Sequence, residues 1–111
     1  MATVTEILRN RTADRERLEK EAPNLYQGFN ELMKHFYKPS ALERKYKELM
    51  AVTASVATRC VPCLANHMSN AVSAGATRDE VIDAAAIGVD SAAGLRSWWC
   101  GSTSSSSWTK S

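Results

Sequence analysis

An abrupt loss of charge in the middle of the chain constrains the fold most. Residues 43–48 (Glu-Arg-Lys-Tyr-Lys-Glu) are mostly charged, whereas the ten residues that follow, Leu49 to Thr58, carry no charge. A helix that has no charged side is usually buried all round. We therefore expect a helix that begins at Ala41, and whose second half is the central element of the fold. The uncharged stretch is far too short to span a bilayer, which takes about 20 residues.

Helix-start signals recur along the chain and predict an all-α fold of about five helices. In a capping box, a Ser, Thr or Asn and a Glu or Gln three residues later satisfy each other's backbone donors. Strand signals are absent, because Val and Ile are scattered and no Asn-Gly or Asp-Gly turn occurs. The boxes are Thr3 with Glu6, Asn24 with Gln27, Ser40 with Glu43 and Thr77 with Glu80, and the other expected helices span about 5–21, 24–37, 62–74 and 78–98.

The expected organisation is one helical domain with distinct ends. Residues 1–22 form a charged helix with a narrow apolar stripe, which predicts a surface or interface helix. Residues 23–99 form the domain proper, and residues 100–111 are rich in Ser, a composition typical of disorder. The second helix carries apolar residues at helical spacing, namely Leu25, Phe29, Leu32, Met33 and Phe36.

Length and charge narrow the class of protein. A chain of 111 residues makes one domain with a thin core, so assembly into an oligomer would help to stabilise it. The net charge of +2 is spread along the chain, and neither nucleic acid nor an anionic membrane is an expected partner. No secretory signal is visible at the N-terminus, so we expect the protein in the cytoplasm, where close cysteines are more often redox or metal groups than structural disulfides.

The candidate chemistry lies in the segment from Cys60 to His67, which reads Cys-Val-Pro-Cys-Leu-Ala-Asn-His. Pro62 breaks one helix and suits the first turn of the next, so Cys60 and Cys63 should flank a helix N-terminus. Free amides and the helix dipole stabilise a thiolate there. His67 follows Cys63 by four residues on the same helix face, where its imidazole can take or hold the thiol proton.

Glu48 is the candidate partner of His67. It is the last charge before the uncharged stretch, and a helix that folds back after residue 60 returns His67 to its vicinity. The carboxylate could then orient the imidazole, as in a catalytic triad. The same residues also allow plainer interpretations: a solvated Glu48, an inert cysteine pair, or a zinc site using Cys60, Cys63 and His67. His35 and the odd thiol Cys100 carry no motif around them.

The combined spacing of Glu48, Cys60, Cys63 and His67 resembles the active-site motif of alkyl hydroperoxidase D (AhpD)-like proteins, in the carboxymuconolactone decarboxylase superfamily. The resemblance covers roughly residues 24–95 and fits the short, single-repeat type. It implies an all-α bundle in a homo-oligomer, commonly a trimer or hexamer, and thiol chemistry without heme, flavin or metal. The chain departs from AhpD itself at Pro62, where AhpD has a histidine.

The resemblance implies a thiol-dependent peroxidase that uses an external dithiol or lipoyl-type reductant. Cys63 would be the peroxidatic cysteine and Cys60 its resolving partner, while Glu48 and His67 would relay protons. Two other interpretations stay open, namely a general disulfide reductase of the same family, and a non-catalytic oligomeric module whose cysteine pair is structural or binds zinc. The decarboxylation that names the superfamily does not require the cysteine pair.

Overall fold

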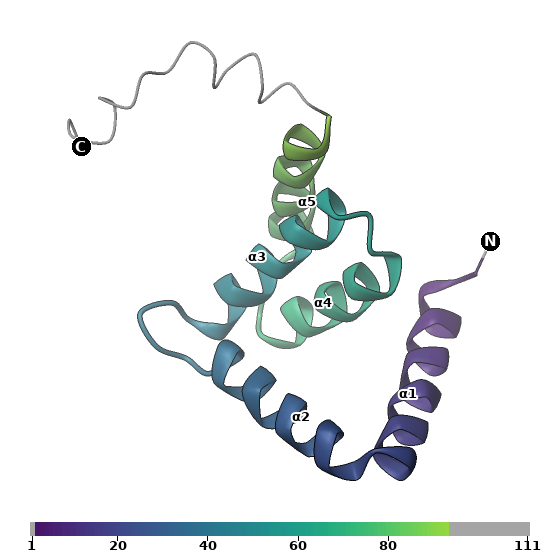
Figure 1. Ribbon diagram of the computed structural model, residues 1–111. Helices are drawn as coiled ribbons and strands as arrows, with labels where there is room; N and C mark the ends of the chain where they lie inside the picture. The colour runs from purple at the N-terminus through teal and green to yellow at the C-terminus, as the bar shows by residue number, and fades with distance from the viewer. Residues whose placement is uncertain (1, 94–111) are drawn as a thin grey trace.

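The computed structural model describes residues 2–93, and this part of the chain is all-α, as predicted (Figure 1). Within it no strand occurs. Residues 94–98 of the expected last helix, Cys100 and the Ser-rich segment lie outside the described residues. None of the described helices is long and apolar enough to cross a membrane. The helices are α1 (Val4–Glu21), α2 (Pro23–Tyr37), α3 (Arg44–Ala57), α4 (Val61–Ser73) and α5 (Arg78–Ala92).

Helix α3 is the central element, with α4 and α5 packed against it (Figure 1). The core that these helices enclose is small and is centred on Val52, which is fully buried. Ala71, Ala76 and Val81 complete its buried part. A core of mostly small side chains lets α4 and α5 pack closely against α3.

The expectation that the second half of α3 is buried on all sides is wrong for the single chain. Val52 and Ser55 are buried there, but Ala54 is exposed and Met50 is 57% exposed. Packing within one chain therefore does not explain why every residue of this segment is uncharged. Two sides of α3 are covered by α4 and α5, and a third remains open.

Helices α3 and α5 meet where α5 carries glycine. A Cβ added at Gly88 would lie 2.5 Å from the backbone oxygen of Thr53 and 2.7 Å from Cβ of Val56. Nearby, the Thr53 hydroxyl donates a hydrogen bond of 2.7 Å to the backbone oxygen of Ala84. Only glycine allows the two backbones to approach this closely.

Two of the four predicted capping boxes are present, those of Thr3 at α1 and Thr77 at α5. The other two are wrong. Helix α2 begins directly at Pro23, and α3 begins at Arg44, later than expected. The Ser40 hydroxyl accepts instead a hydrogen bond of 2.9 Å from Nζ of Lys47, which fastens the connection before α3 to the first turns of that helix.

Helices α1 and α2 form an open V beside the three-helix body (Figure 1). The radius of gyration is 16.9 Å, compared with about 13 Å for a compact chain of this size. One side of α2 is mixed polar and apolar and is half-buried. It carries Tyr26, Asn30, Met33 and Tyr37. The more apolar side is half or more exposed at almost every position, with Leu25 at 67%, Phe29 at 59%, Leu32 at 49% and Phe36 at 56%.

We expect Gly88→Ala to destabilise the protein although alanine favours helices. The new methyl group must displace Thr53 or Val56, and the net loss should be roughly 1–2 kcal/mol. Gly28→Ala in α2 is the matched control, because its added Cβ would meet nothing within 4 Å. That change should stabilise by about 0.5–1 kcal/mol. Equal effects of the two substitutions in urea unfolding would contradict the close approach of α3 and α5.

Candidate active site

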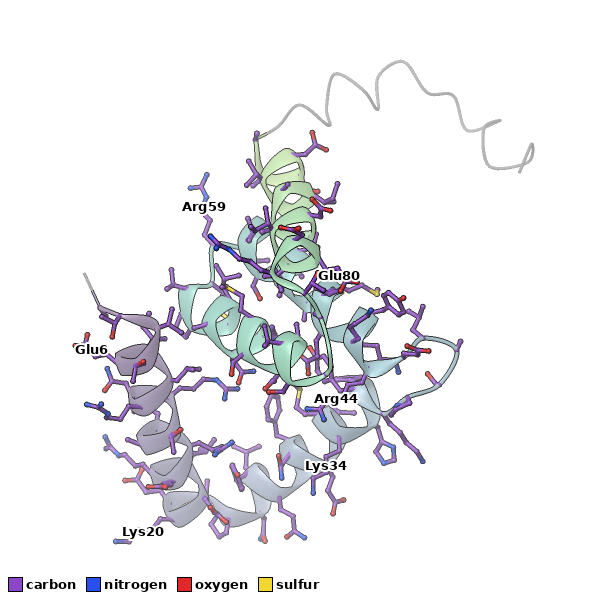
Figure 2. All side chains as sticks on the ribbon, turned by 180° about the vertical axis from the view of Figure 1, so that it is seen from behind. Glu6, Lys20, Lys34, Arg44, Arg59 and Glu80 are labelled. Atoms are coloured by element: carbon purple, nitrogen blue, oxygen red, sulfur yellow. A yellow bond between two sulfur atoms is a disulfide. The ribbon has the colours of Figure 1, made fainter. Side chains whose placement is uncertain are left out.

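A tight turn fixes the position of the first cysteine. At the end of α3 the amide of Arg59 donates to the oxygen of Val56 at 3.1 Å, and the amide of Cys60 donates to the oxygen of Ser55 at 2.9 Å. This pair of bonds is a Schellman motif, which needs a left-handed residue at its centre. Arg59 supplies it with a φ of 57°, and its side chain points away from the bundle (Figure 2). Glycine, as at Gly75 after α4, is the usual choice.

The same turn begins the next helix. Cys60 is the N-cap of α4, and Pro62 lies in the first turn, as the sequence predicts. Cys60 and Cys63 form a disulfide with a Cα–Cα distance of 5.2 Å. Both cysteines are half-buried. The pair therefore sits at the positive end of the α4 dipole, where a released thiolate would be stabilised.

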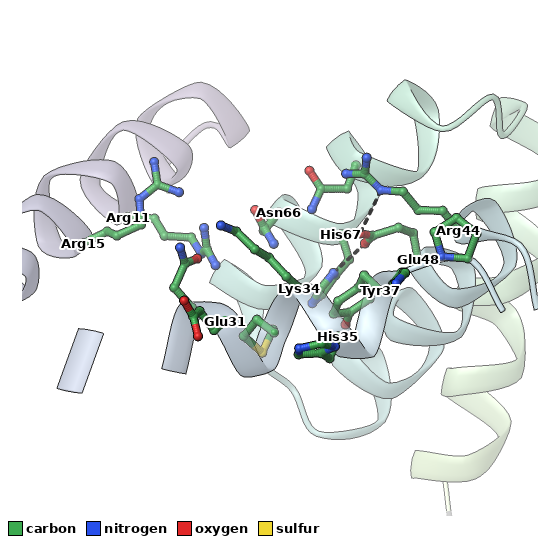
Figure 3. Close-up of a pocket in the computed structure, with 15 residues that line it drawn as sticks. Arg11, Arg15, Glu31, Lys34, His35, Tyr37, Arg44, Glu48, Asn66 and His67 are labelled. Atoms are coloured by element: carbon green, nitrogen blue, oxygen red, sulfur yellow. Dashed lines mark hydrogen bonds and ion pairs between the residues drawn. The ribbon is translucent and has the colours of Figure 1, made fainter. Parts of the chain in front are cut away.

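The predicted contact between Glu48 and His67 is present. Nδ1 of His67 lies 2.8 Å from Oε2 of Glu48, between antiparallel helices α3 and α4 (Figure 3). An ionised carboxylate can only accept a hydrogen bond, so the contact holds a proton on Nδ1. Nε2 is then the nitrogen that can exchange a proton with a reacting group.

Glu48 is almost completely buried, with 2% of its surface exposed, which excludes the interpretation of a solvated glutamate. A buried carboxylate is costly unless it is paired. Besides His67, Nε of Arg44 lies 4.0 Å from its other oxygen, Oε1, one turn earlier on the same helix. Both carboxylate oxygens therefore face a nitrogen of a basic side chain.

Tyr37, at the end of α2, also contacts the imidazole of His67. Its ring stacks on His67 with centroids 5.4 Å apart and planes 25° from parallel. Burial, and secondarily the charge of Glu48, raise the pKa of Tyr37 above its ordinary value. Tyr37 could not be predicted from the sequence, because nothing local distinguishes it from the other aromatic residues of α2.

A pocket of about 870 Å³ opens beside this pair, between α1, α2 and the body (Figure 3). Its lining on α4 comprises Asn66, His67 and Asn70, so it stops one turn short of the cysteines. His35, for which the sequence predicts no role, also contributes to the lining. Many of the other lining residues are cationic, a feature that the even charge distribution along the chain conceals.

The structure thus brings Glu48 to His67 and Cys60 to Cys63, and α4 with its N-cap carries Cys60, Cys63 and His67 in order. Cys63 precedes His67 by one turn, which is a rise of about 6 Å along the helix axis. Among residues 2–93, no three His, Cys, Asp or Glu side chains are grouped so that they could hold a metal ion. The cysteine pair and the Glu48–His67 pair therefore make up the candidate site.

The five helices within residues 2–93, a cysteine pair at a helix N-terminus and a Glu–His pair one turn further define an AhpD-like all-α protein. A model of the carboxymuconolactone decarboxylase family matches residues 23–100. The chain belongs to this family. No curated protein sequence is significantly similar to it.

A solved structure gives the same result. The crystal structure of the apo form of a carboxymuconolactone decarboxylase family protein from Legionella pneumophila is similar to this chain with a TM-score of 0.77. The two sequences are 30% identical, and the match covers 88% of each chain. The match extends over more of this chain than the family model does.

We expect Glu48→Gln to lower the pKa of Tyr37, because the substitution removes the negative charge that disfavours the phenolate. Burial of the ring persists, so the pKa should stay above its ordinary value. Spectrophotometric titration of the tyrosines measures this, with Tyr37→Phe identifying the signal. A pKa of Tyr37 that is the same in both proteins would contradict an ionised Glu48 beside it.

Proposed function

We propose that the protein is a thiol-dependent peroxidase that reduces organic hydroperoxides in the cytoplasm. The observation that carries the proposal is the position of the Cys60–Cys63 disulfide one turn before His67, whose imidazole is held by buried Glu48. Cysteines three positions apart in sequence that bond across a helix start are suited to cycling between dithiol and disulfide. Membership of the carboxymuconolactone decarboxylase family supports this chemistry without specifying it.

In the first step the Cys63 thiolate attacks the terminal oxygen of the hydroperoxide. A sulfur–oxygen bond forms and the oxygen–oxygen bond breaks, so that the peroxide gains two electrons and Cys63 becomes a sulfenic acid. The leaving alkoxide takes from Nε2 of His67 the proton that the Cys63 thiol gave up when it became a thiolate, and departs as an alcohol. Glu48 stabilises the imidazolium form and keeps the ring oriented.

In the second step the Cys60 sulfur attacks the sulfenic sulfur of Cys63. A disulfide forms, the sulfur–oxygen bond breaks, and the hydroxyl group leaves as water after it takes up the proton of the Cys60 thiol. An external dithiol, of the lipoyl type or another, then attacks the disulfide. Exchange through a mixed disulfide returns both protein thiols and oxidises the reductant.

Pro62 shapes this cycle differently from a histidine at the same position. A proline cannot carry a proton, so the relay depends on His67 and Glu48 alone. Its ring instead suits the first turn of α4 and places Cys63 at a fixed distance from Cys60. We infer that the position contributes geometry rather than proton transfer.

A general disulfide reductase is the second candidate function, because the same cysteine pair could reduce a substrate disulfide instead of a peroxide. Turnover on a lipoamide-type disulfide and on an organic hydroperoxide, compared at equal enzyme concentration, separates the two. A zinc-binding module has less support, since Cys60 and Cys63 are bonded to each other and His67 is engaged by Glu48.

We further propose that the protein works as a homo-oligomer, a trimer or hexamer, that uses the exposed face of α2. This face comprises Leu25, Phe29, Leu32 and Phe36, whose 4-3-4 spacing is typical of the seam between two packed helices. The same face of a second copy is complementary to it in spacing and hydrophobicity. Its exposure in the single chain, on an open V of two helices, supports a second copy as the occupant.

Cys63→Ser should abolish dithiol-dependent peroxide consumption, because it removes the nucleophile. Cys60→Ser should still consume about one peroxide per protein and accumulate a sulfenic acid, which dimedone labelling and mass spectrometry detect. Cys100→Ser is the matched control and should turn over normally. Turnover that survives Cys63→Ser would overturn the peroxidase proposal.

The double variant Phe29→Glu/Leu32→Glu should dissociate the assembly, because it places charges in the apolar seam. Gln27→Glu, on another side of the same helix, should leave the assembly intact. Light scattering during size-exclusion chromatography measures the molar mass of each. A monomeric wild-type protein, or an assembly that tolerates both glutamates, would contradict the use of this face.

A further inference from the structure

We propose that the pocket beside Glu48 and His67 selects hydroperoxides that carry an anionic head group, a carboxylate or a phosphate. The inference names the substrate class of the proposed peroxidase and so rests on that function. It depends on three observations: the charge of the pocket lining, the volume and apolar part of the pocket, and its position relative to Cys63.

The lining is strongly cationic. Five basic residues, Arg11, Arg15, Lys34, Lys38 and Arg44, contribute to it, against the two carboxylates of Glu31 and Glu48. Four of the five have no carboxylate oxygen within 4.0 Å anywhere in residues 2–93, the exception being Arg44. Cations that converge without partners repel one another, and an anion between them relieves this repulsion.

The cations come from helices that are far apart in sequence. Arg11 and Arg15 lie one turn apart on α1, and Lys34 lies on α2, from which it extends toward α1 and Asn66 (Figure 3). The V of α1 and α2 thus brings both sets to one space. Glu48 does not neutralise them, because its two oxygens already face His67 and Arg44.

The pocket is also large and partly apolar. Its volume of about 870 Å³ is typical of sites for organic ligands and far exceeds the needs of hydrogen peroxide. Met33, Tyr37 and Pro39 give it an apolar wall. An amphiphilic molecule, with a hydrocarbon part and an anionic head, matches this combination.

The position of the pocket orients such a molecule. When the anionic head of the molecule lies among Arg11, Arg15 and Lys34, the other end of the molecule reaches Asn66 and His67 on α4. Cys63 lies one turn further along the same face of α4. A hydroperoxide remote from the head group would therefore approach the cysteine across the imidazole that supplies its proton.

The test compares a fatty-acid hydroperoxide with its methyl ester, which differs only in the charge of the head group. Wild-type kcat/KM should favour the acid by about tenfold or more at low salt, with the preference falling as salt screens the charges. In Arg11→Gln/Lys34→Gln, kcat/KM for the acid should fall while kcat/KM for the ester stays unchanged, so that the preference is lost. The control Arg9→Gln/Lys20→Gln removes the same charge from exposed positions outside the pocket and should keep the preference for the acid. Equal kcat/KM for acid and ester in the wild type would overturn the inference.

A binding measurement separates this inference from the peroxidase proposal. Isothermal titration of the oxidised protein with decanoate, decyl phosphate and decanol needs no turnover. Binding of either anion but not of decanol, lost in Arg11→Gln/Lys34→Gln, supports the anionic site even if no peroxide is consumed, and the stronger anion identifies the head group. Binding of decanol as tight as that of both anions, or no binding of either anion, overturns it.

Discussion

The buried carboxylate of Glu48 is the constraint on which the rest of the site depends. With 2% of its surface exposed it must find basic partners within the fold, and it finds His67 on α4 and Arg44 on its own helix. The contact with His67 fixes the register of α4 along α3. Val52, one turn after Glu48, then meets the core side of α4, so the polar pair and the apolar core share one helix interface.

The cysteines depend on the same helix pair through the turn that joins its members. Because Cys60 donates its amide to Ser55 and also caps α4, its backbone is fixed relative to both helices. Arg59 accepts a left-handed conformation that costs a non-glycine residue about 1 kcal/mol or more. Such local strain beside a reactive group is typical of functional turns, where the surrounding hydrogen bonds maintain it.

The sequence predicts the parts of this site that lie on one helical hairpin and misses those that come from elsewhere. The charge boundary at Glu48, the break at Pro62 and the spacing to His67 are local patterns, so the hairpin and its Glu–His contact could be predicted. Tyr37 reaches the site through the connection from α2 to α3, and the cations of α1 reach it through the angle between α1 and α2. No periodicity encodes that angle, because Ala22 alone joins the two helices.

Helix α2 shows why a correct helix can still be oriented unexpectedly. Periodicity identifies its most apolar side, and the usual inference places that side in the core. Here the mixed polar and apolar side of α2 packs toward α3 and α4 instead. Tyr37 on that side stacks on His67, and Asn30 lines a polar pocket. The apolar side of Phe29 and Leu32 is then left facing outward, and an exposed apolar patch of this kind is typical of an interaction surface. The proposed assembly would then be coupled to the site, because the orientation of α2 that builds the pocket leaves the opposite, apolar side exposed for the proposed second copy.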